Sequence, residues 1–316
     1  MHNVIVICRP LVIFLLSIVV TLPLLAQDAT PTAVDIKDIP NFGQVIMKID
    51  VPMDNRDFLL AKYVAVQPDL SRIYVASGAS GIVYIFDDKG QLLDEVDTVY
   101  EVPITDMIVG SDGNLYIAQL GNIDVYDRDG QRIRQILGVF SDGVIYSQVI
   151  PLPDKTLLAA QLFGDKDRLY HLDTDGTLIE ESEPGYFSIL NGYEFSQFDR
   201  VVLGQDGYLY YFSHEAKVMY QIDEDWELLA QYSGLIESPQ GDPARTGVLV
   251  DANSRVLLGD FGGVQIFGDK EQLIYTIKLA EQYGFVHHMV FADNGLLITV
   301  QPNTVSIIQY GLRGDN

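Results

Sequence analysis

The chain has 316 residues, 48% of them apolar, and a formal net charge of −24 at pH 7. Such a charge repels nucleic acid and anionic lipid headgroups, so both are excluded as partners, and the length allows a sizeable core in one large domain or two small ones. The 18 Tyr, 14 Phe and 27 Gly residues indicate an all-β protein rather than a helical one.

Residues 1–26 have the pattern of a signal peptide. Arg9 supplies a positive charge, and the apolar run LVIFLLSIVVTLPLLA then ends at Ala26, just before the polar QDATPTA. This run is short for a membrane-spanning helix and matches the apolar region of an export signal. We therefore expect an extracytoplasmic protein that is secreted, periplasmic or at the cell surface. The alternative is an uncleaved N-terminal anchor, because Leu24 is large for its place before the cleavage point.

Residues 27–41 contain Pro and Asp without a clear period and are interpreted as a linker. A repeated unit follows, with a compact apolar strand, a tight Asp-Gly or Asn-Gly turn, two more strands, and a D-x-D-G-like turn before an outer strand. The first turn recurs at Asp69, Asp112, Asp154, Asp206, Asn253 and Asn294. Four short strands repeated at intervals of roughly 40 to 50 residues are typical of β-propeller blades. We predict a six-bladed β-propeller over residues 42–312 and a C-terminal tail over 313–316.

The last unit ends after TVSIIQYG and has no outer strand of its own. The segment NFGQVIMKIDV, residues 41–51, precedes the first unit and matches the outer-strand segments GQLLDEV and GQRIRQI. We predict that it completes the sixth blade. Joining the two parts of the chain in one sheet removes an open edge and closes the ring.

The second unit shows the repeat pattern best, through Asp112, Gly113, Leu115, Tyr116, Ile117, Ile123, Val125, Tyr126, Asp127 and Gly130. This pattern resembles the NHL repeats of exported, bacterial-type propellers, and the resemblance covers about residues 42–312. It implies a binding platform for a protein, peptide or glycan, with a minority of enzymes among such propellers. In the NHL family the residue after the second strand is commonly Asp. Here those positions hold Ser77, Gln119, Gln161, Ser213, Asp260 and Gln301, so only Asp260 keeps it.

Two connections between units are long, over residues 183–198 and 233–247. Long loops on a rigid scaffold often carry function, and these two are expected to form one wall of the loop face. Tyr193 and Phe195 in the first loop and Arg245 in the second are candidate ligand-binding residues. The aromatic side chains can stack on a sugar or a peptide side chain, or they can cover the blades as local core.

A ring of side chains is expected at the mouth of the central channel. The residues that begin the inner strands are Tyr63, Asp106, Gln148, Arg200, Gly247 and His288. From this ring and from the ends of the second strands, the ligand-binding candidates are Asp106, Arg200, His288, Asp260, Gln119, Gln161 and Gln301. They can orient a small polar ligand or form a plug whose polar groups satisfy one another.

His288 beside Asp106 is the candidate general base of an enzyme. Adjacent residues of a regular strand point to opposite faces, so His287 and His288 cannot both chelate one ion. The acidic D-x-D-G turns lack the later ligands of a calcium loop, and their recurrence favours hairpin turns. The single cysteine, Cys8, lies in the signal, so neither a disulfide nor a cysteine-based metal site is expected.

No GxSxG, Walker, HExxH or dinucleotide-binding motif is present, and we expect no metal or cofactor. The sequence therefore favours an exported, monomeric, NHL-like propeller that binds a protein, peptide or glycan through its loop face. The alternative is a propeller hydrolase or lyase that acts on a small ester, lactone or sugar at the channel mouth, with Ca²⁺ as the cofactor such an enzyme would use.

Overall fold

The structure, a computed structural model, describes residues 36, 39–52, 61–77, 80–98, 103–119, 122–137, 146–161, 168–187, 199–233, 247–268, 272–279 and 284–311. All of them belong to the unit Ala33–Asn316. The predicted signal peptide, most of the predicted linker, the C-terminal tail and the candidates Tyr193, Phe195 and Arg245 lie outside the described residues. Within the described part of the chain, no helix is long and apolar enough to span a membrane.

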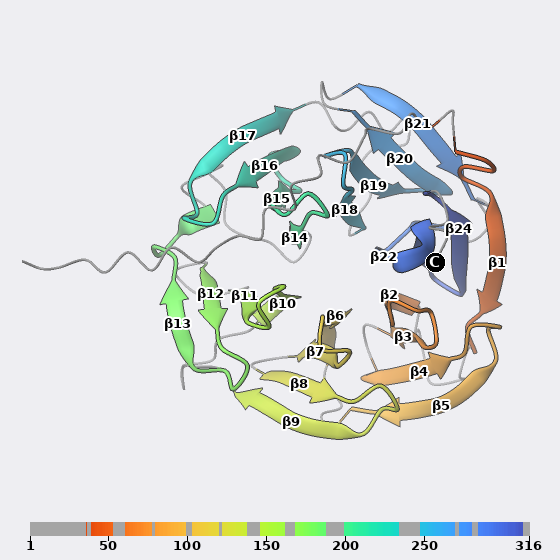
Figure 1. Ribbon diagram of the computed structural model, residues 1–316, viewed down its shortest axis with the longest axis horizontal. Coiled ribbons are helices and arrows are strands. Elements are labelled where there is room, and N and C mark those ends of the chain that lie inside the picture. Colours follow the sequence, from red (N-terminus) through yellow and green to blue (C-terminus); the bar gives the residue numbers. More distant parts are fainter. Residues whose placement is uncertain are drawn as a thin grey trace, which may run out of the picture. The chain divides into compact units, whose positions relative to one another are not determined.

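The described strands form six antiparallel sheets of four strands each, arranged as the blades of a ring (Figure 1). Blades 1 to 3 consist of β2 (Ala61–Val66), β3 (Ile73–Ser77), β4 (Ile82–Phe86) and β5 (Leu92–Asp97); β6 (Ile104–Val109), β7 (Leu115–Gln119), β8 (Asn122–Tyr126) and β9 (Arg132–Leu137); and β10 (Tyr146–Pro151), β11 (Leu157–Gln161), β12 (Leu169–Leu172) and β13 (Leu178–Glu181). Blades 4 to 6 consist of β14 (Arg200–Leu203), β15 (Leu209–Ser213), β16 (Val218–Ile222) and β17 (Leu228–Ser233); β18 (Val248–Val250), β19 (Val256–Asp260), β20 (Gly263–Phe267) and β21 (Leu273–Lys278); and β22 (His288–Ala292), β23 (Leu296–Gln301), β24 (Thr304–Gln309) and β1 (Val45–Asp50), with a 3₁₀ turn at Asp293–Gly295. The prediction of an all-β, six-bladed propeller is confirmed.

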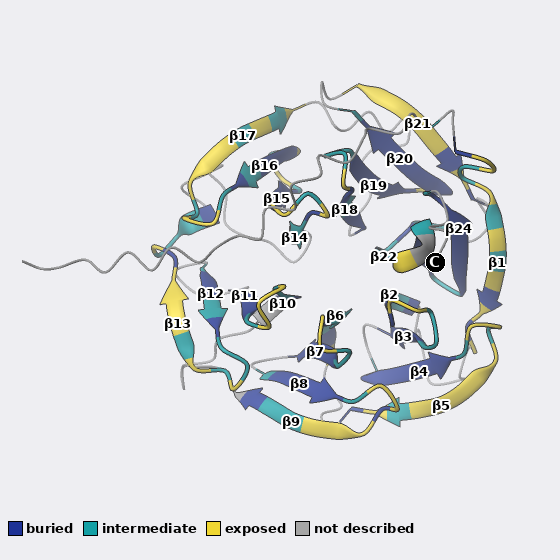
Figure 2. Ribbon diagram, viewed as in Figure 1, coloured by how far each residue is buried: buried dark blue, intermediate teal, exposed yellow. Residues whose placement is uncertain are grey.

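Burial follows the position of a strand in its blade (Figure 2). The second and third strands of blade 1, β3 and β4, are buried along their whole length, and third strands such as β8 and β16 are buried at all but one residue. Neighbouring blades cover both faces of these strands, which explains their nearly continuous apolar sequences. The outermost strands are mostly exposed, as in β5 and β21. The inner edge of the ring is therefore the better place to hold polar groups away from water.

The ring is closed as predicted, because β1 pairs with β24 rather than with a strand near it in sequence (Figure 1). The register places Ile49 opposite Val305 and Asp50 opposite Thr304. Ile49 is only 3% exposed and belongs to a core shared by blades 6 and 1, which also includes Val64. The closure is therefore made by backbone pairing and by side-chain burial together.

The acidic turns before the outer strands are hairpin turns, as predicted. In each of blades 1 to 4 one aspartate accepts two backbone N–H bonds across its turn; these residues are Asp87, Asp127, Asp173 and Asp223. An aspartate that closes a turn on its own backbone is an Asx turn. One oxygen of its carboxylate accepts the local backbone donors.

The glycine of these turns packs against the outer strand of the preceding blade. Gly130 and Gly176 have φ of +84° and +85°. A Cβ added to Gly130 would lie 2.6 Å from Val96, and one added to Gly176 would overlap with Ile136. Both the backbone conformation and the lack of space therefore require glycine here.

Replacing Gly176 by alanine is expected to destabilise the fold by about 3 kcal/mol, from the positive φ and the clash with Ile136 together. Gly207→Ala is the matched control, since Gly207 has φ +88° but nothing within 4 Å of an added Cβ. It should cost only about 1 kcal/mol. Urea unfolding of both variants would measure the difference, and equal losses would show that the contact with Ile136 does not matter.

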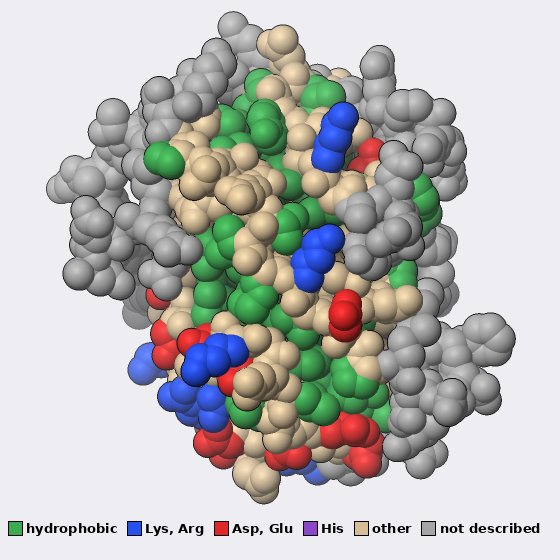
Figure 3. All heavy atoms as spheres, turned by 90° about the vertical axis from the view of Figure 1, so that its right-hand side faces the viewer, with side chains coloured by type: hydrophobic (Ala, Val, Ile, Leu, Met, Phe, Trp, Pro, Cys, Tyr) green, Lys and Arg blue, Asp and Glu red, His purple; other side chains and the backbone are tan. Residues whose placement is uncertain are grey.

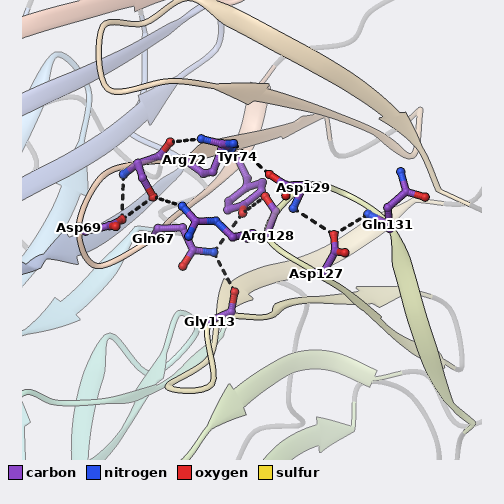
Figure 4. A network of polar contacts seen from close by, with 10 residues as sticks. Gln67, Asp69, Arg72, Tyr74, Gly113, Asp127, Arg128, Asp129 and Gln131 are labelled. Atoms are coloured by element: carbon purple, nitrogen blue, oxygen red, sulfur yellow. Dashed lines mark hydrogen bonds and ion pairs between the residues drawn. The ribbon is translucent and has the colours of Figure 1, made fainter.

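A polar network joins blades 1 and 2 at the end of β2 that is remote from Tyr63 (Figure 4). Gln67 donates hydrogen bonds to the Tyr74 hydroxyl and to the Gly113 carbonyl, and Tyr74 donates to the Arg128 carbonyl at 2.7 Å. Arg72 forms an ion pair with Asp129 at 2.9 Å. These groups satisfy one another, so this end of the seam is structural.

The outer strands carry exposed aliphatic and aromatic side chains in all six blades, namely Ile46, Leu92, Leu93, Ile133, Ile179, Leu228, Leu229, Leu273, Ile274 and Tyr275. On the side of the ring that contains β1, a band of hydrophobic side chains reaches the surface among polar ones (Figure 3). An outer strand is covered by one neighbour only, so its side chains stay partly in water.

Candidate functional site at the channel mouth

The inner strands of three blades begin with a bulge. The pairing register shifts between Ala61 and Tyr63 in β2, and equivalent shifts precede Asp106 in β6 and Gln148 in β10. A bulge turns the next side chain out of the regular alternation and is common beside functional sites. A bulge of the same kind thus positions Tyr63, Asp106 and Gln148.

Side chains of this ring bind the backbone of the next inner strand. Asp106 of blade 2 accepts the Val149 N–H of blade 3 at 3.0 Å, and Gln148 of blade 3 accepts the Val201 N–H of blade 4 at 2.6 Å. His288 of blade 6 approaches Val64 of blade 1, with 3.0 Å between Nδ1 and the carbonyl oxygen. The inner strands are therefore linked from blade to blade by side chains.

Four ring residues also meet across the axis and form what we name the channel-mouth cluster: Tyr63, Asp106, Arg200 and His288. Nε2 of His288 lies 3.7 Å from Oδ1 of Asp106. The Tyr63 ring centre lies 5.7 Å from that of His288, and the Tyr63 side chain hydrogen-bonds Arg200. Blades 1 and 4 are on opposite sides of the ring, so Tyr63 and Arg200 can meet only across the channel.

Arg200 is held by its own strand as well as by Tyr63. It is 5% exposed and donates from Nη1 to the Asp199 carbonyl at 2.8 Å. The Asp199 carboxylate faces blade 4, where it accepts the Tyr211 hydroxyl and the His214 N–H. The guanidinium thus stays at the axis, with Asp106 as the carboxylate that interacts with it there.

Burial shifts the pKa values of the cluster strongly. It raises the pKa of Asp106 to about 6, although the Val149 N–H and Arg200 act in the opposite direction. Burial, followed by the Arg200 charge, lowers the pKa of His288 to about 3. Burial also raises the pKa of Tyr63 to about 12. At neutral pH the cluster therefore holds an ionised Asp106, a neutral His288 and a cationic Arg200.

Nδ1 of His288 lies 3.0 Å from the Val64 carbonyl oxygen and 3.5 Å from the Val64 backbone nitrogen. A carbonyl oxygen only accepts hydrogen bonds, so the shorter contact fits the tautomer with the proton on Nδ1, whereas the longer contact fits the other tautomer. In the first tautomer the lone pair of the neutral ring is on Nε2, the nitrogen that faces Asp106. The carboxylate and this nitrogen then face each other at a distance that leaves room for a proton to be shared after a small movement.

Four other predicted ligand-binding residues that the structure describes have local partners. Gln119 donates to Thr98, Gln161 accepts the Tyr170 hydroxyl, and Gln301 donates to the Gly284 carbonyl. Asp260 accepts bonds from the Phe261 N–H and from Gln265. The structure therefore brings Asp106, Arg200 and His288 together. The hydrogen bonds of the three glutamines and Asp260 instead fix strand ends and loops.

Sequence reasoning missed Lys62, which directly precedes Tyr63. Its Nζ lies 5.3 Å from the centre of the Tyr63 ring. Burial and the Arg200 charge both lower the pKa of Lys62. A strict strand alternation would send Lys62 away from Tyr63, but the register shift between Ala61 and Tyr63 breaks that alternation.

The described residues do not fit a calcium site. Among them, no three His, Cys, Asp or Glu side chains are placed to hold a metal ion together. Asp106 is the one carboxylate that we find in the cluster, and Ca²⁺ takes six or more oxygen ligands, commonly several from carboxylates.

Comparisons with known proteins bear on the fold. No protein-family model matches the chain, and no curated protein matches it. Many solved structures do, and the neighbours include propeller proteins. A gluconolactonase from Xanthomonas campestris has a TM-score of 0.61 at 15% identity, covering 79% of this chain and 86% of that one.

Two other structures extend the comparison. A luciferin-regenerating enzyme has a TM-score of 0.59 at 12% identity, covering 85% and 97% of the two chains. A catalytically inactive histidine-to-alanine variant of virginiamycin B lyase from Staphylococcus aureus, with quinupristin, has a TM-score of 0.54 at 11% identity, covering 85% and 89%. At these identities the similarity shows the fold alone.

Proposed function

We propose that this propeller is a lyase or hydrolase that opens a small ester or lactone at the channel mouth. The observation that carries the proposal is the buried pair of Asp106 and neutral His288, with Nε2 and Oδ1 3.7 Å apart, beside the Arg200 guanidinium. Such a reaction needs a base whose pKa lies near the working pH. It also needs a fixed cation that stabilises the developing negative charge.

In this proposal Asp106 takes the proton. Its pKa of about 6 leaves it ionised at neutral pH but more basic than an ordinary aspartate. The lone pair on Nε2 of His288 can accept a hydrogen bond from the protonated carboxyl, which stabilises that form. Arg200 stabilises the negative charge on the oxygen that leaves or is attacked. Activity should therefore rise with pH as Asp106 ionises, around pH 6.

The structural neighbours support an enzyme of this class. They include a streptogramin B lyase, a gluconolactonase and a virginiamycin B lyase that is catalytically inactive when a histidine is replaced by alanine. Lyases and lactonases thus occur among proteins with this fold. In this chain the residues for such a reaction would be those of the channel-mouth cluster.

The test is an assay of the full chain against γ- and δ-lactones, aldonolactones and aryl esters, each with Ca²⁺ and with EDTA. Asp106→Asn and His288→Ala are both expected to lower kcat/KM at least about 100-fold, as loss of a general acid–base group commonly does. His171→Ala is the matched control, because His171 bonds Thr156 in blade 3, away from the channel. Turnover that survives the His288 change would contradict the proposed mechanism.

Binding of a protein, peptide or glycan through the loop face is the second candidate. Phe261, between β19 and β20, is 36% exposed and packs edge to face against Phe285, with 5.0 Å between ring centres. An exposed aromatic pair of this kind can stack on a sugar or a peptide side chain. With the predicted export, it would make the protein an extracytoplasmic binding module. Glycan-array or pull-down binding that Phe261→Ala abolishes, without turnover, would favour this function.

A further inference from the structure

Blade 6 carries a layer of polar side chains on the face that it turns toward its neighbour, blade 5 (Figure 1). This polar layer consists of two cross-strand pairs, Thr299 with Ser306 and Gln301 with Thr304. The next pair on the same face, Leu297 with Ile308, packs in the hydrophobic core that blades 5 and 6 share, since side chains alternate between the two faces of a strand. All four polar residues are no more than 1% exposed. The seam between the two blades therefore changes from apolar to polar toward the loop face.

Three oxygens of the polar layer have no hydrogen-bond partner among the described residues. They are Oγ1 of Thr299, Oε1 of Gln301 and Oγ1 of Thr304. The Gln301 amide is oriented by its other end, because Nε2 donates to the Gly284 carbonyl at 2.9 Å and a flipped amide would place an oxygen against that carbonyl. Buried polar groups are almost always bonded to protein or to ordered water. Three unpaired oxygens on one face therefore indicate a bound molecule.

The side chains of blade 5 that lie at this end of the seam are apolar. Gly259, Val264 and Ile277 are cross-strand neighbours in β19, β20 and β21. Val264 and Ile277 pack in the same core as Met289 of blade 6. Glycine, valine and isoleucine have no polar side-chain atom, so they cannot bond the two hydroxyls or the amide oxygen. The missing partners have to come from a molecule held in the seam.

The burial and the charge of this place determine which molecule fits. The three oxygens have almost no exposed surface, so a molecule the size of water can reach them without opening the seam, whereas a sugar cannot. The hydroxyls donate and accept, and the amide oxygen accepts, which matches the two donors and two acceptors of water. In β1 the layer continues with Lys48 and Asp50, opposite Ser306 and Thr304. Their charges have opposite signs, so they provide no net negative charge for a buried cation.

We propose that Thr299, Gln301 and Thr304 bind ordered water between blades 5 and 6. The water accepts hydrogen bonds from the hydroxyls and donates to Oε1 of Gln301. The Gly284 carbonyl, which Gln301 bonds, also accepts the Gly262 N–H of blade 5 at 3.1 Å. The water thus extends a hydrogen-bonded link between the two blades at the loop face. This inference does not depend on the proposed function.

Replacing Thr299 and Thr304 together by valine tests the proposal on the full chain, because valine keeps the shape of threonine and removes both hydroxyls. In a dry seam this change would remove two unpaired buried groups, and Tm would rise. With bound water it removes two partners of that water. We therefore expect Tm to fall by about 3 to 6 °C and the signal of long-lived internal water in magnetic relaxation dispersion to decrease.

Thr98→Val is the matched control, since the Thr98 hydroxyl is buried and accepts a hydrogen bond from Gln119. It should lower Tm and leave the internal-water signal unchanged. A crystal structure of the natural chain should show water within hydrogen-bond distance of the three oxygens of the polar layer.

A rise in Tm of the double valine variant, or an unchanged internal-water signal, would overturn the inference. A seam without water in the crystal structure would do the same. A third contrary result would be a Tm of the natural chain that rises with sodium or potassium chloride, but not with choline chloride at equal ionic strength, when the double variant loses this rise. Such a result would assign the site to an alkali cation instead of water.

Discussion

Replacing Ile49 by aspartate is expected to destabilise the propeller by at least about 4 kcal/mol, enough to unfold a domain of ordinary stability. Ile49 is 3% exposed in β1, and its neighbours in the core come from blades 6 and 1. An unpaired carboxylate there would be desolvated without compensation. Because β1 is the outer strand of blade 6, its loss would leave β24 with an open edge and separate the two ends of the ring.

Ile46→Asp on the same strand is the control for Ile49→Asp. Ile46 is 42% exposed, so the same chemical change there should alter stability by less than about 1 kcal/mol. Urea unfolding followed by tyrosine fluorescence and circular dichroism would compare the two variants. If Ile49→Asp melted like Ile46→Asp, the pairing of β1 with β24 would not be what holds the ring closed.

Closure and the candidate site are physically connected. The contact between His288 and Val64 crosses the same seam between blades 6 and 1 that Ile49 fills. A weakened seam should therefore displace His288 from Asp106 before the other blades unfold. The closed ring therefore holds the side chains at the axis in the positions that a reaction requires.

The sequence was sufficient for the architecture because propeller blades repeat local chemistry. The acidic turn residues could be recognised one blade at a time, and hydrogen bonds such as those of Asp127 confirm their role. The outer-strand pattern of residues 41–51 likewise predicted the pairing of β1 with β24. Each of these features depends on residues within one repeat or on comparison between repeats.

The site was harder to predict because it depends on contacts between repeats. Asp106, Arg200 and His288 were named from the sequence as members of one ring, but their approach across the axis could not be read from it, and the bulge that precedes Asp106 leaves no mark in the pattern. Lys62 was missed for the same reason. At the position of the turn glycine, blade 4 has Trp226 with φ +62°, whose carbonyl accepts the Tyr186 hydroxyl. The roles of Tyr193, Phe195 and Arg245 stay predictions.

Replacing Asp106 by asparagine is expected to make the folded protein more stable at pH 8, by about 1 to 3 kcal/mol. Burial raises the pKa of Asp106 from 3.8 to about 6, so the charged carboxylate is less favourable in the folded than in the unfolded chain. Each unit of pKa corresponds to about 1.4 kcal/mol. This cost is absent below pH 3.8 and complete above pH 6. Asparagine removes it and can still accept the Val149 N–H.

The direction in which the stability difference changes with pH shows whether burial of the Asp106 carboxylate causes it. His288 acts in the other direction, because its lowered pKa provides stability that is lost as the pH falls from 6.5 toward 3, but both proteins share that contribution. The stability difference between Asp106→Asn and the natural chain should therefore grow between pH 4 and 6 and stay constant above it. Asp69→Asn is the control and should lower stability at pH 8 rather than raise it. Hydrogen bonds from Ser71 lower the pKa of Asp69, so its charged form is favoured in the folded chain.

A gain in stability together with a loss of turnover in the Asp106→Asn protein would be the signature of a functional carboxylate. Natural chains keep a buried charge that weakens the fold when the reaction or the ligand requires it. If the asparagine variant were instead less stable at pH 8, the attraction of Asp106 for Arg200 would outweigh its desolvation. Asp106 would then be a structural counterion that holds Arg200 at the axis, and the acid–base role would have to be given up.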